Sequence, residues 1–299
     1  MRVFFCDHVE VPLPPGHRFP MAKYARLRER LLSSLVLDPT DLLPSTPAAA
    51  SDLARVHAPH YLEGLLSGTL DPRILRAIGF PWSDALIRRS RASVTGTIAA
   101  ARVALEDGIA GNLAGGTHHA FADRGAGFCV FNDIAVASRT LLDAGDVRRV
   151  LVLDLDVHQG DGTAALFADE PRVYTASIHG EKNFPFLKQR SDLDLALPDA
   201  TGDDEYLAAL EPFLARALAE SSPDIIFFQA GVDALAVDRL GRLGMTAAGM
   251  RRRDERVLGE ARRRGIPIAL TLGGGYADPI DATLDAHVGT YAVAREVYG

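Results

Sequence analysis

Cysteine is scarce in this 299-residue sequence, which contains only Cys6 and Cys129. Two cysteines exclude the disulfide framework of a small secreted domain, and such sparing use fits a reducing compartment. The sequence also lacks an uninterrupted apolar run near the roughly 18 residues that suggest a membrane-spanning helix. Its first apolar stretch reaches Asp7 too early for a signal peptide, so we expect a cytoplasmic protein with no membrane partner.

A surplus of basic residues is absent too. The 39 acidic residues outnumber the 32 lysines and arginines, and the formal net charge is -7. Because nucleic-acid-binding surfaces are normally basic, we expect no nucleic-acid partner. Hydrophobic residues make up 47% of the chain, which is ample for a large core. With no internal repeat and no linker, the sequence predicts one domain over residues 1–299, with proline-rich loops at 11–20 and 44–50.

Apolar, β-branched runs recur along the chain, and each is followed directly by polar or glycine-rich residues. The expected strands are Arg2–Cys6, Ile109–Ala114, Val150–Leu153, Val173–Ala176, Ile225–Phe228 and Ile266–Leu272. The expected helices are Asp84–Glu106, Asp133–Ala144, Asp204–Ser221, Ala247–Arg264 and Pro279–Val297. Pro212 is expected to kink or split its helix, and the arginine runs 251–253 and 262–264 are interpreted as solvated helix faces. This alternation predicts an α/β fold with a central, mostly parallel sheet flanked by helices on both faces.

The carboxyl ends of parallel strands gather at one edge of a sheet, where open α/β folds place their ligand sites. The segment after Val150–Leu153 is the most informative, because residues two apart on an extended chain share a face. Together with the other strand ends it would bring nine side chains to one crevice: His118, His119, Asp154, Asp156, His158, Asp161, His179, Asp233 and Tyr276.

Asp156, His158 and Asp233 are candidate metal ligands. A lone aspartate after a strand is more often a helix cap or a turn residue, but three groups of ligand type together favour a metal. A catalytic zinc site takes three protein ligands and keeps one open position. Two carboxylates and one imidazole also suit iron(II) or manganese, so the presence of a metal is predicted more firmly than its identity.

The pair His118-His119 is either two hydrated loop histidines or a catalytic pair, and its place at the crowded edge favours the second interpretation. A histidine titrates in the range that a general base needs, and Asp154 and Asp161 could orient the two rings. Tyr276 follows three glycines and is either an amphipathic core residue or a hydroxyl donor to an oxyanion. Cys129 could be a nucleophile, but a small buried hydrophobe is the simpler interpretation.

Short segments of the sequence resemble the histone deacetylase family, in particular its small bacterial members with an arginase-like fold. They are GGTHHAF at 115–121, GFCVFND at 127–133, DLDVHQGDG at 154–162, SIHG at 177–180, AGVDAL at 230–235 and LGGGY at 272–276. PGHRFPMAKY near the N-terminus and RVHAPHYL at 55–62 also look like early loops of this family. The segments occur in the family's order, which makes the joint pattern specific.

The resemblance implies a zinc-dependent deacetylase that uses metal-activated water on acetylated lysine side chains or similar acylated amines. Its zinc ligands would be Asp156, His158 and Asp233. His119 would act as general base and then acid, oriented by Asp161, and His118 would assist electrostatically, oriented by Asp154. Tyr276 would polarise the acyl carbonyl.

Further positions follow from the same resemblance. A structural potassium ion would be bound by Asp154, Asp156 and His158 through carbonyls, by the Ser177 hydroxyl and by Ile178, with a second potassium near Phe167 and Val173. An apolar substrate tunnel would have Gly127 and Phe128 on one side, Phe184 or Phe186 opposite, and Gly274 in its lining. Gln159 stands where many members have a second histidine, with no expected effect on metal binding.

Three other functions are compatible with parts of the pattern. An acetylpolyamine amidohydrolase would share the chemistry but should carry a long loop that narrows the entrance, and none is evident. A ureohydrolase with two manganese ions needs further carboxylate ligands. A catalytically silent binding module should lack a histidine or the tyrosine, and none is missing. The sequence leaves open the physiological substrate, the acyl-chain length and the oligomeric state.

Overall fold

The fold is built on one eight-stranded parallel sheet. The computed structural model describes all residues from 1 to 299. The strands are β1 (Val3–Phe5), β2 (Leu42–Pro44), β3 (Ile109–Asn112), β4 (Val150–Asp154), β5 (Val173–Gly180), β6 (Leu193–Leu197), β7 (Ile225–Gln229) and β8 (Ile268–Thr271). Their order in the sheet is β2-β1-β3-β8-β7-β4-β5-β6, and every neighbouring pair is parallel. The predicted parallel sheet is confirmed, and only the two edge strands are missing from the prediction.

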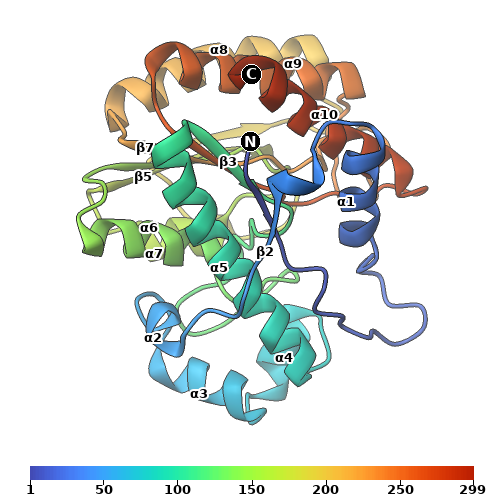
Figure 1. The fold of residues 1–299 in the computed structure, drawn as a ribbon, viewed down its shortest axis with the longest axis vertical. Coiled ribbons are helices and arrows are strands. Elements are labelled where there is room, and N and C mark those ends of the chain that lie inside the picture. The colour runs from blue at the N-terminus through green and yellow to red at the C-terminus, as the bar shows by residue number, and fades with distance from the viewer.

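Helices cover both faces of this sheet (Figure 1). They are α1 (Lys23–Ser33), α2 (Ala50–Leu53), α3 (Pro59–Ser67), α4 (Pro72–Ile78), α5 (Asp84–Asp107), α6 (Asp133–Ala144), α7 (Asp161–Phe167), α8 (Asp203–Ser221), α9 (Ala247–Arg264) and α10 (Asp281–Tyr298). The helices α8, α9 and α10 lie together on one side, α5 and α6 pack together on the other, and α2, α3 and α4 form one end of the molecule (Figure 1). The alternative that Pro212 splits its helix is wrong, because α8 continues through it.

Two of the predicted helices, α5 and α6, begin at a side-chain cap and end at a glycine. The Ser83 side chain accepts a hydrogen bond from the Leu86 N–H at the start of α5, and Asn132 accepts one from Ala135 at the start of α6. Both helices end at a glycine in the left-handed region, with φ of 86° at Gly108 and 75° at Gly145. These caps satisfy backbone groups that helix ends otherwise leave without partners.

Alternate residues of each central strand divide the interior into two apolar cores. On β4, Val150 and Val152 pack with residues of α5 and α6, whereas Leu151 and Leu153 pack with residues of α8, α9 and α10. This is the alternation of a strand that is covered on both faces. The central strands are therefore continuous apolar runs in the sequence, and the polar residues that follow them lie at the edge of the sheet.

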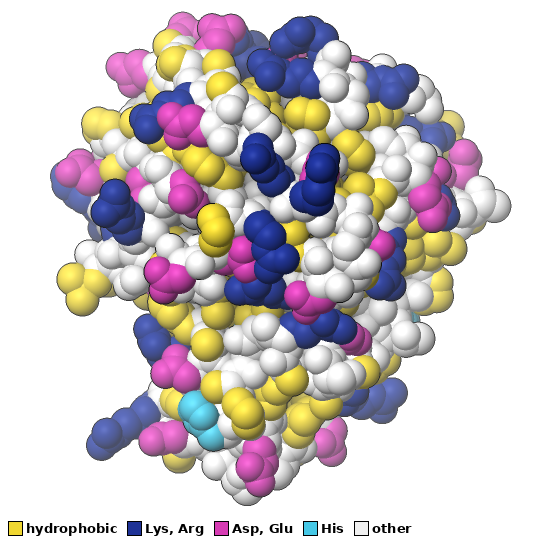
Figure 2. All heavy atoms as spheres, turned by 90° about the vertical axis from the view of Figure 1, so that its left-hand side faces the viewer, with side chains coloured by type: hydrophobic (Ala, Val, Ile, Leu, Met, Phe, Trp, Pro, Cys, Tyr) yellow, Lys and Arg dark blue, Asp and Glu magenta, His cyan; other side chains and the backbone are white.

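The surface carries intermixed charges, and on the face shown in Figure 2 acidic side chains lie among the lysines and arginines. The interpretation of the arginine runs as solvated faces holds for Arg252, whose side chain is 46% exposed, but it is wrong for Arg253, which is 0% exposed. Arg253 lies on the face of α9 that packs against the core, whereas the second run, residues 262–264 in the last turn of the same helix, is exposed throughout. None of the helices is both long and apolar enough to span a lipid bilayer.

Candidate active site

The candidate site lies at the carboxyl ends of four neighbouring strands in the middle of the sheet. His118 and His119 follow β3, residues 154–158 end and follow β4, Asp233 follows β7, and residues 273–276 follow β8. The predicted convergence at one sheet edge is therefore what the topology produces. His179, at the end of β5, lies farther along the same edge, where its Nδ1 is 3.0 Å from the Ser177 hydroxyl.

Asp156, His158 and Asp233 form a buried cluster of three groups of metal-ligand type, whose donor atoms all lie within 4.8 Å of one another. His158 Nδ1 is 3.1 Å from Asp156 Oδ1 and 3.1 Å from Asp233 Oδ2. Ligand atoms at zinc bond lengths in a tetrahedral site lie about 3.3 Å apart. One ring nitrogen carries at most one proton, so it cannot serve two carboxylates well, whereas a divalent cation between the three groups would satisfy all of them. The residues present therefore fit a divalent metal.

Backbone N–H groups hold the two carboxylates of this cluster in place. The Gly274 N–H donates to Asp156 Oδ2 at 2.7 Å, and the Val157 N–H donates to Asp233 Oδ1 at 2.9 Å. A Cβ atom at position 274 would come within 1.9 Å of Asp233 Oδ2, so only glycine allows this approach. The loop after β8 is thereby part of the ligand cluster.

The pKa shifts within this cluster indicate that a bound cation would stabilise it. Burial acts to lower the pKa of His158, but hydrogen bonds and charges from Asp156 and Asp233 outweigh it and raise the pKa to about 10. Burial and the charge of Asp156 raise the pKa of Asp233 to about 7. Both shifts express the cost of holding two carboxylates together away from water.

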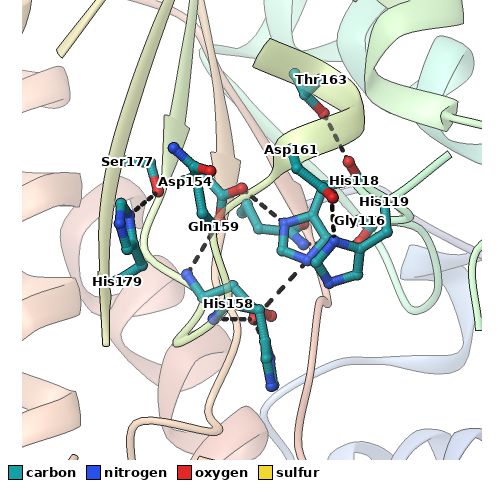
Figure 3. A network of polar contacts seen from close by, with 12 residues as sticks. Gly116, His118, His119, Asp154, His158, Gln159, Asp161, Thr163, Ser177 and His179 are labelled. Atoms are coloured by element: carbon teal, nitrogen blue, oxygen red, sulfur yellow. Dashed lines mark hydrogen bonds and ion pairs between the residues drawn. The ribbon is translucent and has the colours of Figure 1, made fainter. Parts of the chain in front are cut away.

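The two adjacent histidines have separate carboxylate partners, as Figure 3 shows. His118 Nδ1 lies 2.7 Å from Asp154 Oδ2, and His119 Nδ1 lies 2.6 Å from Asp161 Oδ1. The ring centroids of the two histidines are 4.1 Å apart. Because the carboxylates accept, each Nδ1 carries a proton, and the Nε2 of His119 presents a lone pair.

The surroundings give the two histidines opposite protonation states at neutral pH. Burial, helped by the positive charge of His118, lowers the pKa of His119 to about 4 although Asp161 opposes the shift. For His118, burial acts in the same direction, but the charges of Asp154 and Asp156 outweigh it and raise the pKa to about 9. The pair thus offers one neutral imidazole, suited to accepting a proton, beside one cation.

The histidine loop is held by polar side chains from neighbouring elements. Asp133, the first residue of α6, accepts hydrogen bonds from the Gly116 N–H at 3.0 Å and the Thr117 N–H at 2.7 Å. The Gln229 amide, at the end of β7, donates to the Gly116 carbonyl at 2.7 Å. Gly116 has a φ of 76°, and a Cβ atom there would lie 2.0 Å from the Gln229 amide oxygen. The glycines before the histidines are therefore required by the close packing.

Of the residues expected to line a tunnel, Phe186 alone lies away from the candidate site. Phe184 packs edge-on against His119 with ring centroids 4.9 Å apart, and a Cβ atom on Gly127 would touch both rings. Phe128 has a φ of 66° and packs against Tyr276 at 6.1 Å. Phe186 is 83% exposed. Of the two aromatic alternatives, Phe184 is the one that contacts a predicted catalytic residue.

The residues assigned to potassium lie on β4, on the loop after it and on β5. The register of the two strands pairs Asp154 with Ser177, and Ile178 is completely buried next to it. Gln159 anchors the adjoining loop, with its amide group donating to the Gln189 carbonyl at 2.7 Å. The residues of the second potassium assignment, Phe167 and Val173, are both buried within the core on the α5 and α6 side.

Tyr276 lies beside the ligand cluster with its ring among Phe19, Phe128 and Lys23. Burial raises the pKa of its hydroxyl well above the ordinary value, so this group stays protonated and can donate a hydrogen bond. Burial also raises the pKa of Cys129 well above the ordinary value. A buried thiol without thiolate character is not a nucleophile, which agrees with the interpretation of Cys129 as a small hydrophobe.

The sequence assigned no role to three supporting residues, although one of them, Lys23, lies within the family-like segment PGHRFPMAKY. Arg253 on α9 donates to the carbonyls of Gly231 at 2.6 Å and Leu155 at 3.3 Å, each one or two residues before a candidate ligand. Asp238 accepts a hydrogen bond from the Tyr276 N–H at 2.6 Å. Lys23 donates to the Gly275 carbonyl at 3.2 Å. Long-range contacts of this kind leave no local sequence pattern.

The comparisons with known proteins agree with one another. The family model described as histone deacetylase domain matches residues 17–290. An uncharacterized protein from Picosynechococcus sp. is 47% identical over 297 residues, covering 99% of this chain and 98% of that protein. Histone deacetylase 2 from Arabidopsis thaliana is 33% identical over 269 residues, covering 87% of this chain and 70% of that protein. The crystal structure of an HDAC homolog complexed with SAHA is similar with a TM-score of 0.81 and 25% identity, covering 99% of this chain and 88% of that chain.

Proposed function

This chain belongs to the histone deacetylase family and has its arginase/deacetylase-like fold, and on that premise we propose that it is a zinc-dependent hydrolase that removes acetyl or other acyl groups from lysine side chains. The observation that carries the proposal is the pairing of His118 and His119 with two different carboxylates beside a three-ligand cluster. That all eight strands join one sheet supports treating residues 1–299 as one domain.

Asp156, His158 and Asp233 would hold the metal, with zinc as the first choice and iron(II) as the alternative. When bound, such an ion supplies a Lewis acid that polarises a carbonyl oxygen and acidifies water. The Gly274 and Val157 N–H groups orient the ligand carboxylates before any ion arrives. Hydrogen bonds of this kind strengthen and align a metal site.

His119 is the proposed general base and acid. Its neutral ring, held at Nδ1 by Asp161, accepts a proton from the attacking water at Nε2 and returns it to the leaving amine nitrogen. The cationic His118 stabilises the negative charge that develops on the acyl oxygen. Tyr276 donates its hydroxyl hydrogen to the same oxygen. The protonation states that burial and the neighbouring carboxylates impose on the two histidines support this division of roles.

The remaining assignments are part of the same proposal. Gly127, Phe128, Phe184 and Gly274 would line the path of an acylated side chain, since an alkyl stem can lie along apolar walls with its amide at the tip. Phe186, at 83% exposure, would sit at the rim. Asp154, Ser177 and Ile178, with the carbonyls of residues 156 and 158, would bind a structural potassium ion.

The test is a substrate panel. The zinc-reconstituted protein is assayed with acetyl-lysine and longer acyl-lysine peptides and with acetylated spermidine and putrescine, with His119→Ala as the matched control. We expect the acyl-lysine peptides to have the higher kcat/KM, because discrimination between substrates is expressed in that ratio. We also expect a hydroxamate on a linear alkyl linker to inhibit.

Two results would contradict the proposal. If the acetylated polyamines are hydrolysed much faster than every acyl-lysine peptide, the enzyme is an acetylpolyamine amidohydrolase with the same chemistry. If the zinc-loaded protein hydrolyses none of the amides while binding the peptides, it is a binding module that retains the fold.

A further inference from the structure

Lys23, the first residue of α1, is buried beside the active site without a carboxylate partner. Only 2% of the residue is exposed, and the single hydrogen bond of its side chain runs from Nζ to the carbonyl oxygen of Gly275 at 3.2 Å. A buried ammonium group is costly unless it is paired. Burial indeed lowers the pKa of Lys23 to about 8, although the charges of Asp233 and Asp238 act in the opposite direction.

Aromatic rings surround this ammonium group. Lys23 Nζ lies 4.7 Å from the ring centroid of Tyr276, 5.4 Å from that of Tyr24 and 5.5 Å from that of Phe19. A cation over the face of an aromatic ring is attracted by its quadrupole. The Tyr276 ring also packs against Phe19 and Phe128, each at 6.1 Å. The ring of Tyr276, which carries the proposed oxyanion donor, is thus in contact with Lys23, Phe19 and Phe128.

The peptide group that joins Gly275 to Tyr276 is held at both of its polar ends. Its carbonyl accepts the hydrogen bond from Lys23, and its N–H donates to Asp238 Oδ2 at 2.6 Å. Gly275 itself has a φ of 152°, in a region that favours glycine, so the segment before the tyrosine lacks the restraint that a side chain would provide. The ammonium group of Lys23 and the carboxylate of Asp238 thus fix the orientation of this peptide group, and with it the direction in which the Tyr276 side chain leaves the backbone.

We propose that Lys23 is a positioning residue for Tyr276, which together with Asp238 orients the Gly275–Tyr276 peptide and, through its contact with the ring, places the tyrosine hydroxyl for catalysis. The inference rests on the proposed function of Tyr276. An apolar side chain would fill the same space without burying a charge, so packing alone does not account for a lysine here. The positioning role accounts for it, because the ammonium group of Lys23 contacts both the Gly275 carbonyl and the face of the Tyr276 ring.

The test is a double-mutant cycle with Lys23→Met and Tyr276→Phe, measured on the best substrate of the panel after metal content and the unfolding midpoint have been checked. Misplacement of a catalytic group by about 1 Å costs on the order of 100-fold, so we expect Lys23→Met to lower kcat by about 10–100-fold. In the Tyr276→Phe background, the same substitution should change kcat less than about threefold, since the hydroxyl to be placed is already gone. Lys23→Arg, which keeps a cationic donor, should recover part of the loss.

An equal factor in both backgrounds, or no loss in either, would overturn the inference, because a purely structural lysine acts independently of the Tyr276 hydroxyl. If Lys23→Met does not fold, the cycle is run with Lys23→Gln. Hydrogen exchange separates this inference from the proposed function. Exchange of the Tyr276 N–H, measured without substrate, should be about tenfold faster in Lys23→Met. Faster exchange in a protein without deacylase activity would preserve the positioning role and reject the function, whereas unchanged exchange would reject the positioning role.

Discussion

Arg253 and Asp254 form an ion pair from which solvent is excluded, since the exposed fractions of their side chains are 0% and 1%. Arg253 Nε donates to Asp254 Oδ1 at 2.8 Å, and Asp254 Oδ2 accepts from the Thr290 hydroxyl at 2.6 Å. The same guanidinium also donates to the carbonyls of Gly231 and Leu155. One side chain therefore serves two purposes, as the partner of a buried charge and as a donor to the backbone beside the proposed metal ligands.

Removing both members of the pair should cost less than the sum of the costs of removing each one alone. Asp254→Leu is nearly isosteric and leaves the guanidinium without its counter-charge, and breaking a buried pair in this way costs about 3–5 kcal/mol. Arg253→Met leaves the carboxylate unpaired at a similar cost. The double variant leaves no buried charge, so its loss of stability should be smaller than the sum of the single losses by about 2–3 kcal/mol. Total stabilities are about 5–15 kcal/mol, so these differences are large.

Zinc affinity should follow a different order. Arg253→Met and the double variant both lose the donor to the Gly231 and Leu155 carbonyls, and loss of such an outer partner typically weakens metal binding by about 10–100-fold. Asp254→Leu keeps that donor and should bind zinc more tightly than the other two. Urea unfolding gives the stabilities, and competition with a chelator gives the zinc dissociation constants. Arg252→Met, on the exposed face of the same helix, is the matched control and should stay within about 0.5 kcal/mol of the wild type.

Two outcomes would refute this reasoning. Additive single losses would mean that the two side chains do not act as a pair. Wild-type zinc affinity in Arg253→Met would mean that the carbonyl contacts have no influence on the ligands.

Further variants test the remaining assignments. Asp156→Ala and Asp233→Ala should lose most bound metal by elemental analysis, and full occupancy in both would reject the ligand set. Removal of zinc by a chelator should lower the unfolding midpoint of the wild type, because a ligand that binds only the folded state adds about 4 kcal/mol at 1,000 times its dissociation constant; an unchanged midpoint would argue against a bound metal. Tyr276→Phe should keep its metal and slow turnover by about 10²–10³, and wild-type turnover would remove the tyrosine from the mechanism. His119→Ala should lose more turnover than His118→Ala while both retain zinc, and a reversed order in steady-state assays would exchange their roles.

The centre of the fold and the convergence of the candidate site residues at one sheet edge could be predicted from the sequence for the same reason. Strands covered on both faces are continuous apolar runs, so β4 and β7 stand out and their polar ends mark the sheet edge. The edge strands lack this signal. β2 has three residues and ends at Pro44, and β6 alternates between buried and exposed positions over only five residues. The short helix α7 likewise offers too few turns for a periodic pattern.

The supporting residues could not be predicted, because their roles depend on contacts between distant segments. Lysine and arginine are rarely buried, so the sequence favours exposed positions for Lys23 and Arg253. Lys23 meets Gly275 across 252 positions of the chain. Only the packing of α1 and α9 against the sheet reveals that these two side chains point inward.

The place of β8 in the sheet has a consequence for how the protein is made. β8 is the last of the eight strands along the chain, yet it lies between β3 and β7 in the sheet, and Ile109 of β3 is paired with Ile268. A chain still being translated therefore has two incomplete strand edges in its centre, and parallel pairing over such a separation forms slowly. The Gly274 N–H that orients Asp156 follows β8 as well. The proposed metal site can be completed only after β8 and Gly274 have been synthesised, and until then the unpaired edges of β3 and β7 are open to non-native strand pairing.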